Sequence, residues 1–125
     1  MTPSINSVHR IRFGILTLSD RSARGEREDT SGLALARLVD EQGWSVNRQL
    51  ILPDDEFAIR ATLREWADAG DLDVILTTGG SGFSPRDVTP EATRAVIERE
   101  APGLAEAMRA ASLKITPHAM LSRIV

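Results

Sequence analysis

The most informative part of the chain is the stretch Thr77-Thr78-Gly79-Gly80-Ser81-Gly82-Phe83-Ser84-Pro85-Arg86-Asp87-Val88-Thr89-Pro90-Glu91. An apolar strand is predicted just before the three glycines, and an Arg-Asp pair and a helix start follow them. Glycine lets a backbone approach a ligand closely, and successive N–H groups in such a turn form a concave site for an anion. An acidic side chain a few positions later indicates a cation that accompanies the anion. The stretch therefore predicts a site for a phosphate-bearing ligand and a divalent metal ion.

A simpler interpretation of the three glycines is a tight turn between a strand and a helix. Gly79, Gly80 and Gly82 fall within four residues, which is more glycine than one turn requires, so we favour the phosphate site. Two standard nucleotide motifs are excluded. A Walker A loop needs a lysine after its last glycine, and the dinucleotide fingerprint needs a glycine where Pro85 stands. The loop therefore differs from both of the common nucleotide-binding loops.

Strands and helices are predicted to alternate along the chain. Apolar residues on both faces of the segment 11–18 are typical of a strand in a parallel sheet that helices cover on both sides. Thr89 is predicted as a helix N-cap, with Pro90 in the first turn. The predicted strands are 11–18, 44–52 and 72–78, the last being the clearest buried strand; the predicted helices are 30–42, one from Asp54 or Asp55 to 69, 89–100 and 104–114. This alternation predicts an α/β fold with right-handed crossovers.

Polar loops follow all three predicted strands, at residues 19–29, 53–55 and 78–88. Ligands of parallel sheets gather beyond the carboxyl ends of the strands, so these loops are expected to share one rim. Taken alone, Asp54 is best explained as a helix N-cap. For Asp87, pairing with Arg86 or capping of a local turn is the simpler alternative to a functional role. Their common rim favours a magnesium site, because magnesium takes one or two carboxylates together with phosphate oxygens.

Cationic side chains at such a site have to be arginines, because Lys114 is the only lysine. Arg21, Arg24 and Arg27 form either an ordinary solvated loop or a clamp on anionic ligand groups. A nucleophilic role is not expected for Ser19, Ser31 or Ser81, since no histidine lies near any of the three in the sequence. The hydroxyl of Ser81 is better placed to donate a hydrogen bond to a phosphate.

The composition is that of an ordinary globular domain: 125 residues, 42% hydrophobic and 26% charged. A net charge of −3 without a basic block argues against nucleic acid as the main partner. The chain has no cysteine, and no apolar run has the length of a signal peptide or of a membrane span. We therefore expect a flexible lead-in over residues 1–10, one domain over 11–125, and a cytoplasmic enzyme or binding protein with no membrane partner.

Several motifs together resemble the molybdopterin adenylyltransferase family of the Mog and MoaB type. Leu16-Thr17-Leu18-Ser19-Asp20-Arg21, with Gly25, Asp29, Ser31 and Gly32, is similar to the first strand and loop of that family. Leu52-Pro53-Asp54-Asp55 looks like its Pro-Asp turn, and residues 76–92 are similar to its signature almost position by position. Pro102-Gly103, Met108-Arg109 and Leu121-Ser122-Arg123 resemble its later segment. The resemblance covers nearly everything after residue 10.

The resemblance implies a three-layer, Rossmann-like α/β sandwich around a mostly parallel sheet. It also implies an enzyme that transfers the adenylyl group of Mg-ATP to molybdopterin and releases pyrophosphate, in a homotrimer or homohexamer. By position, Asp54 and Asp87 match the two functional aspartates, and we expect them to be catalytic and to bind Mg²⁺. The other expected substrate- and phosphate-binding residues are Ser19, Asp20, Thr78, Gly79, Gly80, Ser81, Gly82 and Arg86.

Two departures from the family pattern bear on these expectations. Ser81 stands where the family usually has threonine, which keeps a hydroxyl donor. The family continues beyond the Ser-Arg segment into another strand, a Leu-Pro-Gly turn and a helix, so we expect a chain truncated after Val125 or one that lacks part of the site. The alternative functions are a MoaB-type protein that binds molybdopterin without efficient catalysis, and a hydrolase of the competence-damage type. The presence of both aspartates favours the adenylyltransferase.

Overall fold

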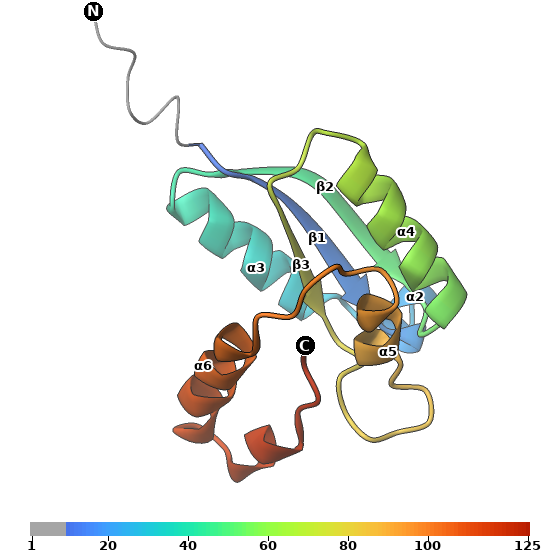
Figure 1. The fold of residues 1–125 in the computed structure, drawn as a ribbon, viewed down its shortest axis with the longest axis vertical. Helices are drawn as coiled ribbons and strands as arrows, with labels where there is room; N and C mark the ends of the chain where they lie inside the picture. The colour runs from blue at the N-terminus through green and yellow to red at the C-terminus, as the bar shows by residue number, and fades with distance from the viewer. Residues whose placement is uncertain (1–9) are drawn as a thin grey trace, which may run out of the picture.

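Three parallel strands form the centre of the structure, a computed structural model that describes residues 10–125. β1 (Arg12–Leu18) lies between β2 (Ser45–Leu52) and β3 (Val74–Thr78), which gives the strand order β2-β1-β3 (Figure 1). The predicted α/β class and parallel sheet are confirmed. The lead-in predicted for residues 1–10 lies, except for Arg10, outside the described residues, so its flexibility and the domain start at residue 11 stay predictions.

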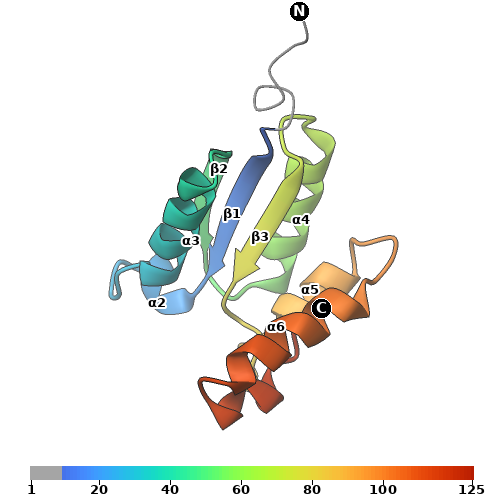
Figure 2. The same cartoon turned by 90° about the vertical axis from the view of Figure 1, so that its left-hand side faces the viewer.

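Helices cover both faces of this sheet, so the predicted three layers are present. Figure 2 shows α3 (Thr30–Glu41) on one face and α4 (Glu56–Asp68) on the other. Asp29 caps α3 by accepting a hydrogen bond from the Gly32 N–H, and Asp55 caps α4 in the same manner. Both helices begin and end within two residues of the bounds expected from the sequence.

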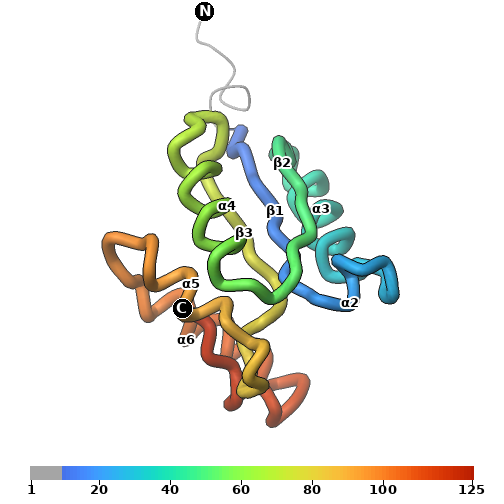
Figure 3. Tube along the Cα trace, turned by 90° about the vertical axis from the view of Figure 1, so that its right-hand side faces the viewer, coloured from blue at the N-terminus to red at the C-terminus, as the bar shows by residue number. Residues whose placement is uncertain are grey.

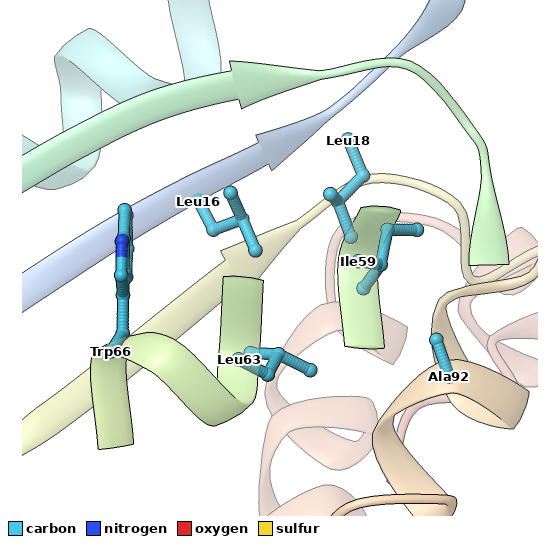
Figure 4. Packing of buried hydrophobic residues seen from close by; sticks show 6 residues of the cluster. All are labelled: Leu16, Leu18, Ile59, Leu63, Trp66 and Ala92. Carbon is cyan, nitrogen blue, oxygen red and sulfur yellow. The ribbon is translucent and has the colours of Figure 1, made fainter. Parts of the chain in front are cut away.

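The apolar core lies between β1 and α4 and fixes the level at which the strands end. Every residue of β1 after Arg12 is buried. Figure 4 shows side chains of this cluster, which are Leu16, Leu18, Ile59, Leu63, Trp66 and Ala92. Burial of one such Leu or Ile side chain stabilises the fold by about 1.5–3 kcal/mol. The carboxyl end of β1, where the first polar loop begins, is therefore held firmly.

β3 corrects one expectation. The sequence predicts it as the clearest buried strand, over residues 72–78, but it begins at Val74 and all five of its residues are only half-buried. The reason is its place in the sheet: within residues 10–125, β3 pairs with β1 alone and forms an edge. The apolar composition predicts that the segment is a strand. Its place at the edge follows from the strand order, which the composition does not contain.

The start of the next helix corrects another expectation. Thr89 is not the N-cap of α5 (Thr89–Arg94); Val88 precedes the helix and provides no side-chain hydrogen bond. The Thr89 hydroxyl instead donates to the Gly79 carbonyl oxygen at 2.8 Å, and its N–H donates to Gly80 O at 3.1 Å. The threonine thus ties the helix to the glycine loop. α5 also ends at Arg94, earlier than the predicted end near residue 100.

The remaining helices gather at the carboxyl end of the sheet (Figure 3). The first polar loop contains a short helix, α2 (Asp20–Ala23), which the sequence does not predict. α6 (Pro102–Leu113) packs against a 3₁₀ helix, η1 (Pro117–Leu121), in the segment whose structure is ambiguous from sequence. Across residues 10–125, no helix combines the length and the apolar character needed to cross a membrane.

Candidate functional site

A cavity of about 300 Å³ opens at the carboxyl ends of the strands. Its walls come from the loop after β1, the start of α3, the Pro-Asp turn after β2 and the glycine loop after β3. The lining residues among those predicted for the site are Ser19, Asp54, Thr78, Gly79, Gly80 and Asp87. Asp20, Ser81, Gly82 and Arg86 lie outside the lining. The topology thus brings the two aspartates to one cavity, as their shared rim predicted.

Backbone conformation and close packing require glycine at two positions of the loop. Gly79 and Gly80 have φ angles of +95° and +67°, in the left-handed region that disfavours side chains. A Cβ at Gly79 would lie 2.2 Å from Leu18 O, and one at Gly80 would lie 2.2 Å from the Thr89 hydroxyl oxygen. The simpler interpretation as a tight, closely packed turn therefore accounts for these two glycines. Contact of the loop with phosphate stays a prediction that the glycines alone do not establish.

Asp54 is not the N-cap of α4. Asp55 fills that role, since its Oδ1 accepts from the N–H groups of Phe57 and Ala58 at 3.0 and 3.4 Å. Oδ2 of Asp54 instead accepts from the Asp20 N–H at 3.1 Å, and the Asp54 N–H donates to Oδ1 of Asp20 at 3.0 Å. This reciprocal pair joins the loop after β1 to the turn after β2.

The second oxygen of the Asp54 carboxylate is the most unusual atom of the site. Oδ1 is buried and has no hydrogen-bond partner within the described part of the chain. Burial raises the pKa of the Asp54 carboxyl above its ordinary value, and the negative charges of Asp20 and Asp87 act in the same direction. A buried acceptor without a partner costs about 1–3 kcal/mol, so this oxygen is suited to a ligand that completes it.

Asp87 accepts a hydrogen bond from the Ser84 N–H at 3.0 Å through Oδ2, which closes a local turn. It is not paired with Arg86, as one alternative proposed. Arg86 instead binds Asp20 with two hydrogen bonds of 3.0 Å from Nε and Nη2, and this bidentate pair lowers the pKa of Asp20. Both Asp20 and Arg86 are therefore engaged with the protein, and their contact with substrate stays a prediction.

The donor set fits a magnesium ion only if the substrate supplies the remaining ligands. In residues 10–125 no group of three or more histidine, cysteine or acidic side chains has the arrangement of a metal site. Asp54 and Asp87 both line the cavity and are close enough for their charges to interact. Magnesium uses one or two carboxylates with phosphate oxygens and water, so two carboxylates and an unpartnered oxygen are compatible with it.

The sequence predicts only part of the cavity wall that the segment from α2 to the start of α3 forms. Ser22 lines it from α2 and Thr30 and Ser31 from the start of α3, while Arg27, Glu28 and Asp29 line it from the loop between these helices. Arg27 is thus the arginine of the first loop that reaches the cavity, whereas Arg21 and Arg24 are not part of its lining, and Arg24 pairs with Glu26. The hydroxyl residues carry no sequence signal beyond the family pattern, because single serines and threonines are common in loops.

Asp29 is part of this wall and ties it to β1 and to α3. Its Oδ1 accepts from the Gly32 N–H and its Oδ2 accepts from the Thr17 hydroxyl, both at 2.8 Å. A Cβ at position 32 would lie 2.1 Å from Oδ2 of Asp29, so glycine is required there. Asp29 could be found in the sequence as an N-cap three residues before Gly32, although its bond to Thr17 of β1 could not.

Several curated proteins are similar to this chain over most of its length. Among curated relatives, the molybdenum cofactor synthesis protein cinnamon of Drosophila melanogaster is 47% identical over 116 residues, covering 90% of this chain and 19% of the relative. Molybdopterin adenylyltransferase of Escherichia coli K12 is 40% identical over 121 residues, covering 94% of this chain and 62% of the relative. The corresponding protein of Helicobacter pylori J99 is 39% identical, with 90% and 65% covered. The chain thus spans less than two thirds of the length of these relatives.

Solved structures have the same fold. The molybdopterin biosynthesis enzyme MoaB from Thermus thermophilus is 50% identical with a TM-score of 0.83, covering 90% of this chain and 71% of that one. A MogA structure is 37% identical with a TM-score of 0.84, and 90% and 73% of the chains are covered. CinA from Thermoplasma acidophilum, at 21% identity and a TM-score of 0.65, shares the fold alone.

The family itself follows from a model that describes a probable molybdopterin binding domain and that matches residues 14–125. The matched range includes β2, β3, β1 from Gly14 onward and every residue of the cavity wall. With this match and with relatives of about 40% identity over most of its length, the chain belongs to the molybdopterin-binding family of molybdenum cofactor biosynthesis proteins.

Proposed function

We propose that the cavity binds the terminal phosphate of molybdopterin next to Mg-ATP and that the protein transfers the adenylyl group. The observation that carries this proposal is the pair of aspartates on the cavity, one of which has a buried oxygen without a partner among the described residues. Two uncompensated carboxylates would repel a phosphate, so they are useful at a phosphate site only when a cation lies between. The resemblance to the adenylyltransferases supports the choice of substrates.

In the proposed reaction, an oxygen of the molybdopterin phosphate attacks the α-phosphorus of ATP. A new P–O bond forms, the bond from the α-phosphorus to the bridging oxygen breaks, and pyrophosphate leaves with the electron pair. Magnesium would neutralise charge on the transferred phosphoryl group and on the leaving pyrophosphate. Catalysis of this kind depends on positioning and charge neutralisation more than on covalent chemistry by the protein.

The residues of this chain have separate roles in that scheme. Asp54 and Asp87 hold the metal on one side of the cavity. Backbone N–H groups of Gly79 and Gly80 bind a phosphate, and the hydroxyl of Ser81, which lies outside the cavity lining, would have to turn towards it to take part. On the opposite wall, Arg27 and the hydroxyl groups of the α3 start are suited to a second anionic or polar portion of the substrates.

Molybdopterin binding without efficient catalysis is the second candidate. It rests on the resemblance to the MoaB type, since a MoaB structure, itself described as a biosynthesis enzyme, is 50% identical to this chain. It is also compatible with the pairing of Arg86 to Asp20, which leaves that guanidinium engaged before a substrate arrives.

One assay separates the two candidates. The protein is incubated with molybdopterin, ATP and MgCl₂, and pyrophosphate and adenylylated molybdopterin are measured. Adenylyl transfer predicts both products in equal amounts, and predicts their loss when EDTA is added. Binding without turnover predicts a calorimetric titration with molybdopterin but no pyrophosphate above the level without protein, and this result would refute the enzymatic proposal.

Assembly and localisation belong to the same proposal. A homotrimer or homohexamer in the cytoplasm is supported by the family resemblance, and several large apolar side chains of the α6–η1 region are exposed, such as Leu104, Ile115 and Met120. The acidic net charge of −3 supports the absence of nucleic acid as a partner. Sedimentation equilibrium tests the assembly, and a monomer at micromolar concentration would refute it.

A further inference from the structure

We propose that Arg123 is a positioning residue that sets the place of Asp87 at the cavity by holding the loop between Gly82 and α5. The activity assay for this proposal rests on the proposed function. The contacts of Arg123 are independent of that function. Arg123 lies near the end of the chain, yet its contacts are with residues more than thirty positions earlier. No motif predicts this role.

The guanidinium of Arg123 contacts the loop at both ends. Nε donates to the carbonyl oxygen of Gly82, at the start of the segment, and Nη2 donates to the carbonyl oxygen of Asp87 at 2.7 Å. Nη1 donates to both carboxylate oxygens of Glu91 in α5, at 3.1 and 2.9 Å. The backbone N–H of Arg123 adds a bond to Ser81 O at 2.8 Å.

The same guanidinium also covers the middle of the loop. Its Cζ lies 5.5 Å from the ring centroid of Phe83, a side chain that is otherwise 69% exposed. One side chain therefore bridges the strand-proximal end, the middle and the helix-proximal end of the segment. A planar group with five donors on three nitrogens can make these contacts together, whereas the three donors of a lysine ammonium all lie on one nitrogen.

Arg109 of α6 places Arg123 in turn. Its Nε donates to Ser122 O at 2.9 Å and its Nη2 donates to Ile124 O at 2.8 Å. These two carbonyls flank Arg123 in sequence. The two arginines thus connect α6 to the glycine loop, and Figures 1 and 2 show α5 and α6 at the carboxyl end of the sheet.

The consequence for Asp87 follows from what else holds it. Within the loop, Asp87 and Ser84 exchange two hydrogen bonds, from the Ser84 N–H to Oδ2 and from the Asp87 N–H to Ser84 O at 2.9 Å. These bonds fix a local turn but not the position of that turn relative to β3. Two sets of contacts tie the turn to the rest of the fold: Arg86 next to Asp87 pairs with Asp20, and Arg123 binds the Asp87 carbonyl together with Gly82 and Glu91.

The experiment compares Arg123→Gln and Arg123→Lys with Arg94→Gln. Arg94 also pairs with a glutamate, Glu100, but on the exposed surface and outside the loop, so this variant controls for the loss of one positive charge. The readouts are kcat, the Mg²⁺ concentration for half-maximal pyrophosphate release, and hydrogen exchange of the Ser84 and Asp87 amides. Arg109→Ala serves as a second variant that disturbs Arg123 without removing it.

The expected result is a fall in kcat and a rise in the half-maximal Mg²⁺ concentration, each about 10- to 100-fold, in Arg123→Gln. Arg123→Lys should recover only part of both, and Arg94→Gln should change neither. The two loop amides should exchange faster in Arg123→Gln, while the amides of β1 exchange as in the unaltered protein. The double variant with Arg109→Ala should be no worse than Arg123→Gln alone, because both act through one residue.

Failure of this proposal and failure of the proposed function are distinguishable. If the unaltered protein transfers no adenylyl group but the loop amides still exchange faster in Arg123→Gln, the function is wrong and the positioning role stands. If the unaltered protein is active and Arg123→Gln retains its kcat, Mg²⁺ dependence and exchange rates, the positioning role is wrong. Equal loss of protection in the loop and in β1 would also overturn it, since the effect would then be general unfolding.

Discussion

Asp54 follows β2 almost directly, whereas Asp87 lies in the long loop between β3 and α5. The first is held by a reciprocal pair of hydrogen bonds with Asp20 and has one carboxylate oxygen buried. The second is held by a local turn and by an arginine from the end of the chain. Both aspartates therefore depend on contacts distant in sequence, but Asp54 is tied to the loop after the neighbouring strand β1, whereas Asp87 is tied to a segment near the end of the chain.

Asp87→Asn should have the largest effect on activity. The amide keeps an oxygen for the Ser84 N–H but removes the charge that the metal and the phosphate groups require, so kcat should fall about 10²- to 10³-fold. Pyrophosphate release under saturating substrates measures the change. The thermal midpoint should stay within about 2 °C of the unaltered protein, because the substitution leaves the turn in place. Retained turnover would remove Asp87 from the catalytic assignment.

Asp54→Asn should act mainly on the metal. The buried Oδ1 is the atom that a cation would complete, and an amide in its place weakens this contact, so the half-maximal Mg²⁺ concentration should rise about 10- to 100-fold. A titration of activity with MgCl₂ checks the shift. Excess Mg²⁺ should recover part of the activity that Asp54→Asn loses, and less of the activity that Asp87→Asn loses. An unchanged titration curve for Asp54→Asn would contradict a metal role for Asp54.

Asp20→Asn tests the link between the two halves. Asp20 accepts two bonds from Arg86 of the glycine loop and one from the Asp54 N–H, so it joins both carboxylate-bearing segments. The amide loses the charge that holds Arg86, and we expect about a tenfold loss in kcat/KM. Steady-state kinetics measure it, with Asp73→Asn as the matched control. If Asp20→Asn changes only the thermal midpoint, the link is structural and not part of the site.

Asp73→Asn should give the smallest effect, and only on stability. Asp73 pairs with Arg12 at the opposite end of the sheet from the cavity, and the Arg12 guanidinium lowers the pKa of Asp73 from 3.8 to about 2. A lowered pKa in the folded state stabilises the fold above pH 3.8, and this contribution is lost as the pH falls towards 2. Urea unfolding between pH 5 and pH 2 should therefore show a shallower pH dependence in the variant, with unchanged activity at pH 7.

The sequence predicts the parts of the fold that short-range patterns encode. The apolar segments indicate the three parallel strands, and Asp55 and Asp29 cap their helices as such residues usually do. The edge position of β3 could not be read in this way, because an apolar strand looks the same in the middle of a sheet and at its edge. The hydroxyl of Thr89 likewise binds the Gly79 carbonyl in place of a capping bond, a contact that depends on where the glycine loop folds back.

The candidate site is predictable to the same extent. Asp54 and Asp87 are placed at one rim by the rule that parallel strands end together, and both line the cavity. The partners of Arg86 and the role of Arg123 were not predictable. Both arginines bind groups at separations of 32 residues or more, and sequence spacing carries no information on such pairs. The sequence thus predicts where the two carboxylates lie, but it does not predict the contacts that hold them.

The reciprocal bonds between Asp20 and Asp54 also limit how this protein can diversify or be redesigned. Each side chain accepts from the backbone of the other, so each position needs a short side chain with an acceptor at the length of Asp or Asn. Longer or apolar residues at either position would open the junction between two strand ends. New substrate preferences are therefore best sought on the opposite wall, at Ser22, Arg27 and Ser31, where the lining side chains can vary without disturbing this junction.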